Sequence, residues 1–127
     1  MMKLAPISAL VLLVACAPAK FIEKGIHDGV EVAYRWNHPV DKPSELLLRL
    51  KNTTAGDKHL DLVLDLSYQG LTVESFEADT CIRAGQTMNG KLNGIYFVPQ
   101  RLTTAQIKDG GADLDMTRTL IEPATCP

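Results

Sequence analysis

The sequence has no apolar run long enough to span a bilayer. The uncharged stretch at its start, residues 4–14, is eleven residues long, whereas a transmembrane helix needs about 20, and Pro6 would disturb a long helix through it. Basic charge is also scarce, since 13 Lys and Arg against 15 Asp and Glu give a formal net charge of −2. We therefore expect neither a retained transmembrane helix nor a nucleic-acid partner.

Residue types that carry catalysis are few and scattered. His27, His38 and His59 are the only histidines, and no two of them have the close spacing of zinc motifs. Ser67 and Ser75 lack the elbow motif of a nucleophilic serine. We predict that the chain is not an enzyme and that it needs no cofactor.

One row of polar residues resembles a cation site, namely Asp57, His59, Asp61 and Asp65. On a single strand, however, side chains four residues apart lie about 13 Å from each other, which is too far for both to bind one ion. We therefore predict no metal site and interpret the row as the solvated outer face of a strand. A metal site built from all three histidines would require three separate segments to converge.

The first 16 residues have the layout of a secretory signal, with Lys3 before an uncharged run and small residues near its end. Leu13-Val14-Ala15-Cys16 resembles, position by position, the lipobox of bacterial lipoproteins. The resemblance implies cleavage after Ala15, a diacylglyceryl thioether on Cys16 and a further acyl chain, such as palmitate, on its amino group. Ala17, where an inner-membrane retention signal would place Asp, implies the outer membrane. The alternative is an ordinary secretion signal in which Cys16 falls by chance.

This resemblance divides the chain into a signal peptide (1–15), a lipidated tether (16–20) and one folded domain (21–127). Removing 15 of 127 residues leaves 112, the length of a single domain. Because the removed segment contains Lys3 and no acid, the formal charge moves from −2 to −3. The protein part therefore offers little attraction to anionic headgroups, and two or three acyl chains would hold it on the membrane.

Two cysteines remain once Cys16 carries lipid, and an even number is expected of a disulfide in an exported chain. Cys81 and Cys126 are the only intramolecular pair left. By closing a loop, their bond would lower the entropy of the unfolded chain and so stabilise the fold by about 4 kcal/mol. It would also hold the C-terminal residues against the fold. The alternative is two free or separately buried thiols.

Alternation of apolar and polar residues dominates the rest of the chain and is typical of half-buried strands. Residues 29–36 place Val32, Tyr34 and Trp36 inward and Glu31 and Arg35 outward. In residues 58–67 the even-numbered leucines, including Leu62 and Leu64, point inward, and Asp61 and Asp65 point outward. Residues 45–51 share this phase, and the turn formers in 52–57 predict that the two leucine-rich strands form one antiparallel hairpin. A helix is the competing interpretation.

Later segments are shorter. We predict strands over 71–76, around Cys81, over 88–92 and 95–98, and over 112–121, with Asn93-Gly94 as a tight hairpin turn. In the last strand Ala112, Leu114, Met116 and Leu120 share one phase, with Arg118 as the exception. Residues 102–108 predict at most one helical turn, capped by Thr103.

About seven short strands without a long helix predict an all-β fold, an antiparallel immunoglobulin-like β-sandwich. True immunoglobulin domains place a tryptophan between two paired cysteines, whereas Trp36 precedes both Cys81 and Cys126 here. The predicted function is a membrane-anchored, non-catalytic interaction module of a cell-envelope assembly, with a protein partner on the same membrane and the domain on its periplasmic face. The alternative is a lipoprotein that binds a small solute or metal ion through groups such as His27, His38 and Tyr34.

Overall fold

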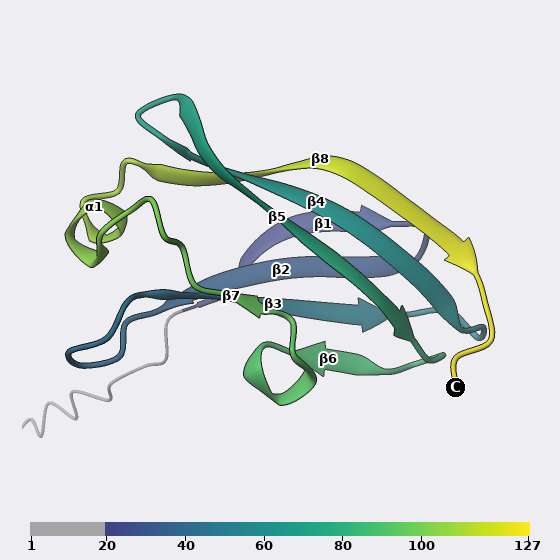
Figure 1. Cartoon of the computed structure of the whole chain (residues 1–127). Helices are drawn as coiled ribbons and strands as arrows, with labels where there is room; N and C mark the ends of the chain where they lie inside the picture. The colour runs from purple at the N-terminus through teal and green to yellow at the C-terminus, as the bar shows by residue number, and fades with distance from the viewer. Residues whose placement is uncertain (1–19) are drawn as a thin grey trace, which may run out of the picture.

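Two antiparallel β-sheets, packed face to face, form the fold in a computed structural model that describes residues 20–127 (Figure 1). This confirms the predicted all-β sandwich. The immunoglobulin-like type stays a prediction. In chain order the elements are β1 (Ile22–His27), β2 (Val30–Asn37), β3 (Glu45–Asn52), β4 (Lys58–Tyr68), β5 (Leu71–Ile82), β6 (Thr87–Asn89), the 3₁₀ turn η1 (Lys91–Asn93), β7 (Tyr96–Phe97), α1 (Thr104–Lys108) and β8 (Ala112–Pro123).

Sheet A has the strand order β1-β2-β3-β6, with β7 also paired to β3, and sheet B has the order β5-β4-β8. Leucines of β3 and β4 fill the space between the sheets, because alternate residues of each strand point to the same face. The fully buried leucines of these two strands are Leu46, Leu48, Leu50, Leu60, Leu62, Leu64 and Leu66. The two leucine rows thus face each other across the sandwich and form most of its core.

The predicted orientation of the side chains is confirmed for β2 and β4. Val32, Tyr34, Leu62 and Leu64 are buried in the core, and Trp36 packs against it while partly exposed. Asp61 points to the outer side as predicted, yet only 8% of its surface is exposed. Its burial comes from neighbours on the outer face of sheet B and not from the core.

The predicted hairpin between residues 45–51 and 58–67 is wrong. β3 pairs with β2, β6 and β7, whereas β4 pairs with β5 and β8, so the connection between them crosses from sheet A to sheet B. The buried Asn52 holds this crossing. Its amide nitrogen donates to the carbonyl oxygens of Gly56, Ile82 and Arg83, and its carbonyl oxygen accepts from Thr54. Two strands with leucine rows bury more apolar surface facing each other than lying side by side.

The predicted Asn93-Gly94 hairpin is also wrong, although Gly94 does have a positive φ of 70°. β6 and β7 do not pair with each other, because both pair with β3 one after the other. Leu48 donates to Ile95 and accepts from Gly90, so residues 91–94 leave and rejoin a single edge of sheet A. The exposed Leu92 lies in this excursion.

Three further strands, β1, β5 and β8, differ from the prediction. β1 was not predicted, and β5 is one continuous strand of 12 residues where two segments were expected. In β8 the register shifts between the partners of Val63 and Leu64, which are Arg118 and Met116. Beyond this bulge, the side chains of β8 alternate in the opposite sense. Leu120 therefore lies on the outer face of sheet B with Arg118. The prediction that Leu120 points to the same side as Met116 is wrong.

The predicted helical turn is confirmed as α1, with Thr103 and Gln106 forming a capping box at its start. Together with the loop of residues 38–44, α1 lies at one end of the molecule, and the C-terminus lies at the other (Figure 1). Among residues 20–127, no helix is long and apolar enough to cross a membrane.

Candidate functional site

The outer face of sheet B is strongly acidic, and we call it the acidic face. Each strand contributes side chains to it, since residues paired across antiparallel strands point to the same side. Its carboxylates are Asp61 and Asp65 from β4, Glu77 and Asp79 from β5, and Asp113, Asp115 and Glu122 from β8. Arg118 and His59 are the basic residues at outward positions of these strands. This excess of negative charge would attract cations or a basic protein surface.

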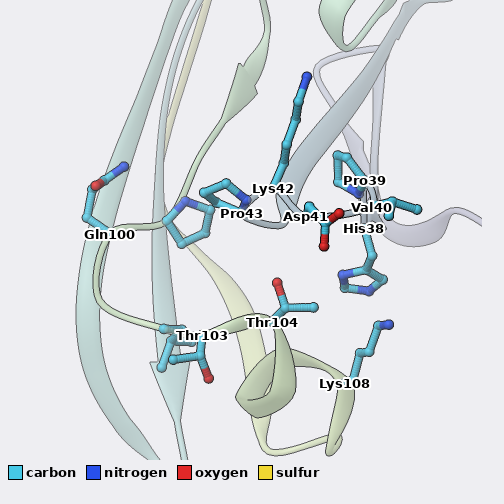
Figure 2. A pocket seen from close by; sticks show the side chains of 12 residues that line it. His38, Pro39, Val40, Asp41, Lys42, Pro43, Gln100, Thr103, Thr104 and Lys108 are labelled. Carbon is cyan, nitrogen blue, oxygen red and sulfur yellow. The ribbon is translucent and has the colours of Figure 1, made fainter.

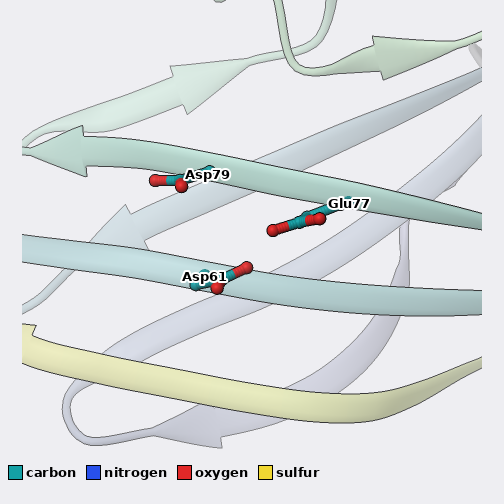
Figure 3. A group of neighbouring side chains, drawn as sticks. All are labelled: Asp61, Glu77 and Asp79. Atoms are coloured by element: carbon teal, nitrogen blue, oxygen red, sulfur yellow. The ribbon is translucent and has the colours of Figure 1, made fainter.

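Three of these carboxylates converge at the centre of the acidic face. One oxygen of each of Asp61, Glu77 and Asp79 lies within 4.8 Å of the others. Asp61 pairs directly with Asp79 across the β4–β5 ladder, and Glu77 is opposite Val63, two residues along. Figure 3 shows the carboxylates of Asp61 and Glu77 pointing toward each other, with Asp79 beside them on β5 and its carboxylate directed toward the end of that strand. We call them the carboxylate cluster.

Two basic side chains bind the edges of the carboxylate cluster. Nη2 of Arg118 donates to Oδ2 of Asp61, and the two form an ion pair. Nε2 of His59 lies 2.6 Å from Oδ1 of Asp79. Oδ1 of Asp61 is buried and has no hydrogen-bond partner among residues 20–127. In Figure 3 one oxygen of Asp61 points toward Glu77, and the other points toward β8, the strand that carries Arg118. The unpartnered oxygen therefore faces into the cluster.

Crowding of like charges changes the acidity of Glu77. Its contact with the carboxyl group of Asp61 and the negative charge of that group raise the pKa of Glu77 above its ordinary value of 4.5, and nearby Asp79 acts in the same direction while Arg118 opposes it. The negatively charged form of Glu77 is thus disfavoured in the fold. A proton or a cation between Glu77 and Asp61 would relieve this repulsion.

The carboxylate cluster was not predicted, because the spacing of residues along one strand does not reveal which residues a neighbouring strand brings beside it. The 13 Å spacing excludes a site made from Asp61 and Asp65 alone, but β5 brings Glu77 and Asp79 beside Asp61 from 16 and 18 residues away. The signal that could have found them is the alternation after residue 74, where Ser75, Glu77, Asp79 and Cys81 alternate with apolar residues and Thr80.

A cleft of about 700 Å³ lies between the loop of residues 38–44 and α1 (Figure 2). Nδ1 of His38 is 2.7 Å from Oγ of Ser44, which donates to Oγ1 of Thr104 at 2.8 Å. Burial, with a smaller effect from Lys108, lowers the pKa of His38. Ser44 is 3% exposed, and its hydroxyl proton is directed at Thr104. This serine therefore links the loop to α1 and is not placed as a nucleophile.

The structure does not bring the histidines together. His27 and His38 flank β2, whose eight residues extend about 26 Å at 3.3 Å per residue. The ring of His27 bonds to the carbonyl oxygen of Lys24, and His59 is on the outer face of sheet B. Tyr34 is buried between the sheets, where burial raises its pKa. His27, His38 and Tyr34 therefore do not line one cavity, and solute binding stays an untested alternative.

Cys81 and Cys126 form a disulfide with a Cα–Cα distance of 5.6 Å, as predicted. The predicted lipidation site Cys16 and the signal peptide lie outside the described residues. Comparison with protein-family models, with curated proteins and with solved structures found no match for this chain.

Proposed function

We propose that this chain is a lipid-anchored, non-catalytic interaction module of a cell-envelope assembly, held on the periplasmic face of the outer membrane. The acidic face binds a basic surface of a protein partner on the same membrane. The observation that carries this proposal is the accumulation of seven carboxylates on one sheet face, against one arginine and one histidine on the same strands and Lys24 of β1, which lies 3.9 Å from Asp113. Such a face gives electrostatic complementarity, which selects a partner and speeds its association.

The tether limits where the partner can be. β1 begins at Ile22, so only residues 17–20 separate a lipidated Cys16 from Phe21. Four residues extend about 13 to 14 Å at roughly 3.3 to 3.6 Å each. A domain on so short a tether stays close to the headgroups, and a partner within its reach is embedded in the same membrane or rests on it.

The position of Phe21 favours an outward orientation of the acidic face. The ring of Phe21 lies 4.4 Å from the guanidinium carbon of Arg49 and 5.4 Å from that of Arg35. Both arginines alternate with core residues of sheet A and so point to its outer side. The chain thus enters the fold on the side opposite the acidic face. Anionic headgroups would repel that face and leave it free to bind a partner.

The interior supports binding without catalysis. The space between the sheets is filled by buried apolar side chains, and the buried Ser44 next to His38 donates its hydroxyl proton to Thr104. Cys81 is bonded to Cys126 and offers no thiolate. The alternative function, binding of a small solute, would have to use the open cleft beside His38.

Crosslinking in intact cells, followed by mass spectrometry of captured proteins, tests this function. Asp65→Asn combined with Asp115→Asn removes two neighbouring charges from the acidic face, and we expect capture of the partner to fall several-fold and to fall further as salt rises. Glu23→Gln combined with Glu31→Gln removes two charges from sheet A and is the matched control. Equal capture by the two double variants, or partners found only in solution or in the opposite membrane, would contradict the proposal.

A further inference from the structure

We propose that the carboxylate cluster of Asp61, Glu77 and Asp79 is a binding site for a hard divalent cation, with Ca²⁺ as the fitting ion. This goes beyond the docking function, because the cluster is built entirely within sheet B and needs neither lipid nor partner. The argument depends on ligand chemistry, on spacing and on one buried oxygen that has no partner.

The ligand set has the chemistry that Ca²⁺ prefers. All three side chains offer carboxylate oxygens, and Ca²⁺ takes six to eight oxygen ligands at about 2.3 to 2.6 Å, with water completing the shell. Two oxygens on opposite sides of such an ion are about 4.6 to 5.2 Å apart. The three carboxylates bring one oxygen each within 4.8 Å of one another. One ion between them can therefore contact all three.

Oδ1 of Asp61 independently indicates a ligand. Asp61 is 8% exposed, and its Oδ1 is buried without a hydrogen-bond donor from residues 20–127. A buried carboxylate oxygen that loses contact with water is costly unless another group compensates for it. Arg118 binds only Oδ2, so it holds the carboxylate in position and leaves Oδ1 directed toward Glu77.

The neighbouring basic groups leave room for the ion. His59 contacts Oδ1 of Asp79, and Oδ2 of that residue has no hydrogen bond to residues 20–127. Glu77 lies on the exposed side of the cluster, where water can enter as a further ligand. The charge of Arg118, paired with Asp61, opposes cation binding, so we expect the weak affinity of extracellular calcium modules, with a Kd of roughly 0.1 to 1 mM.

A proton on Glu77 is the competing partner for Oδ1 of Asp61. A divalent ion compensates the charge of two carboxylates, whereas a proton compensates that of one. The two partners differ in what they predict for calcium. A shared proton makes the protein insensitive to Ca²⁺, whereas a cation site makes it more stable as Ca²⁺ is added.

The experiment measures Ca²⁺ binding by titration calorimetry and the Tm of the full chain, purified in a mild detergent, at constant ionic strength and neutral pH. We expect one site per chain and a rise in Tm of about 5 °C or more at about 10 mM CaCl₂. MgCl₂ should act more weakly, since Mg²⁺ demands octahedral geometry and gives up its water reluctantly.

Two exposed ligands give variants that should fold. Glu77→Gln and Asp79→Asn should each weaken Ca²⁺ binding at least about tenfold. In EDTA, Glu77→Gln should have a higher Tm than the unmodified protein, because it removes the repulsion between Glu77 and Asp61. Asp65→Asn is the matched control, since it removes one charge from the same face of β4 and keeps an oxygen for Ser75, and its Ca²⁺ response should be unchanged.

Two results would overturn the proposal. In the first, CaCl₂ gives neither binding heat nor a Tm change with the unmodified protein, while Glu77→Gln has a higher Tm than that protein in EDTA. This result would show that a proton shared with Glu77 is the partner of the buried oxygen of Asp61. The other is an equal calcium response in Glu77→Gln and Asp65→Asn, which would show diffuse attraction to the acidic face. Neither result depends on partner capture, so this proposal and the docking function fail separately.

Discussion

Leu64 lies in the middle of the core, fully buried, between Phe76 on β5 and Met116 on β8. Its neighbours on the same face of β4, Leu62 and Leu66, are buried as well. A cavity at this position could not collapse without moving both neighbouring strands, so the packing of this single side chain matters for the whole sandwich.

Leu64→Ala should lower the free energy of unfolding by roughly 2 to 5 kcal/mol, because it removes buried methyl groups and leaves a cavity. Urea unfolding followed by tryptophan fluorescence measures the loss. Leu71→Ala is the control, since Leu71 is 73% exposed and its truncation should change stability by at most about 0.5 kcal/mol. A similar small effect for both variants would show that β4 does not face the core as described.

At the scale of elements, the C-terminal segment is attached to the turn before β4 by several independent contacts. The carboxylate of Asp57 accepts hydrogen bonds from the backbone nitrogens of Cys126 and Ala84, and its carbonyl oxygen accepts from Ala124. The two backbone bonds to its carboxylate lower the pKa of Asp57. The disulfide joins the same tail to β5, so the turn, the tail and β5 are held as one unit.

Loss of the disulfide should destabilise the fold without unravelling this unit completely. Cys81→Ser combined with Cys126→Ser should lower the free energy of unfolding by up to about 4 kcal/mol, the chain entropy of the closed loop. Urea unfolding measures it, and the unmodified protein under reductant should match the variant. Intact mass after alkylation without reductant provides the check on the bond itself, since two alkylated thiols would contradict it.

At the scale of the whole molecule, the acidic face and the start of the described chain lie on opposite sides. The chain enters beside Arg35 and Arg49 on sheet A, whereas the carboxylates collect on the outer face of sheet B. A net charge of −2 conceals this separation. If Cys16 carries the proposed lipid, the acyl chains and not the protein charges would determine membrane attachment.

Cys16→Ser should release the protein from the membrane fraction or stop its processing, because the thioether that carries two acyl chains can no longer form. Membrane fractionation with immunoblotting measures this. Ala17→Ser, a neighbouring change that keeps Cys16, is the control and should remain membrane-bound. A Cys16→Ser protein that stays on the membrane at the mature size would show that the lipobox interpretation is wrong.

The sequence alone was sufficient for features that depend on local periodicity. Alternation over residues 29–36 and 58–67 determined which side chains of β2 and β4 point inward, since the period of a strand is two. The Thr103 cap and the Cys81–Cys126 pair were also predicted from the sequence. The cap depends on local residues, and the pair follows if Cys16 is taken as the lipidation site.

Only the tertiary structure decided which strands are neighbours. Turn formers in residues 52–57 fit a hairpin and a crossing between sheets equally well, and burial of the leucine rows of β3 and β4 against each other favours the crossing. Likewise, nothing in the spacing of Asp61 and Asp65 indicates that Glu77 and Asp79 arrive from β5 beside Asp61. The carboxylate cluster exists because strand pairing brings together residues that are distant in the chain, and pairing is determined by the packing of the whole core.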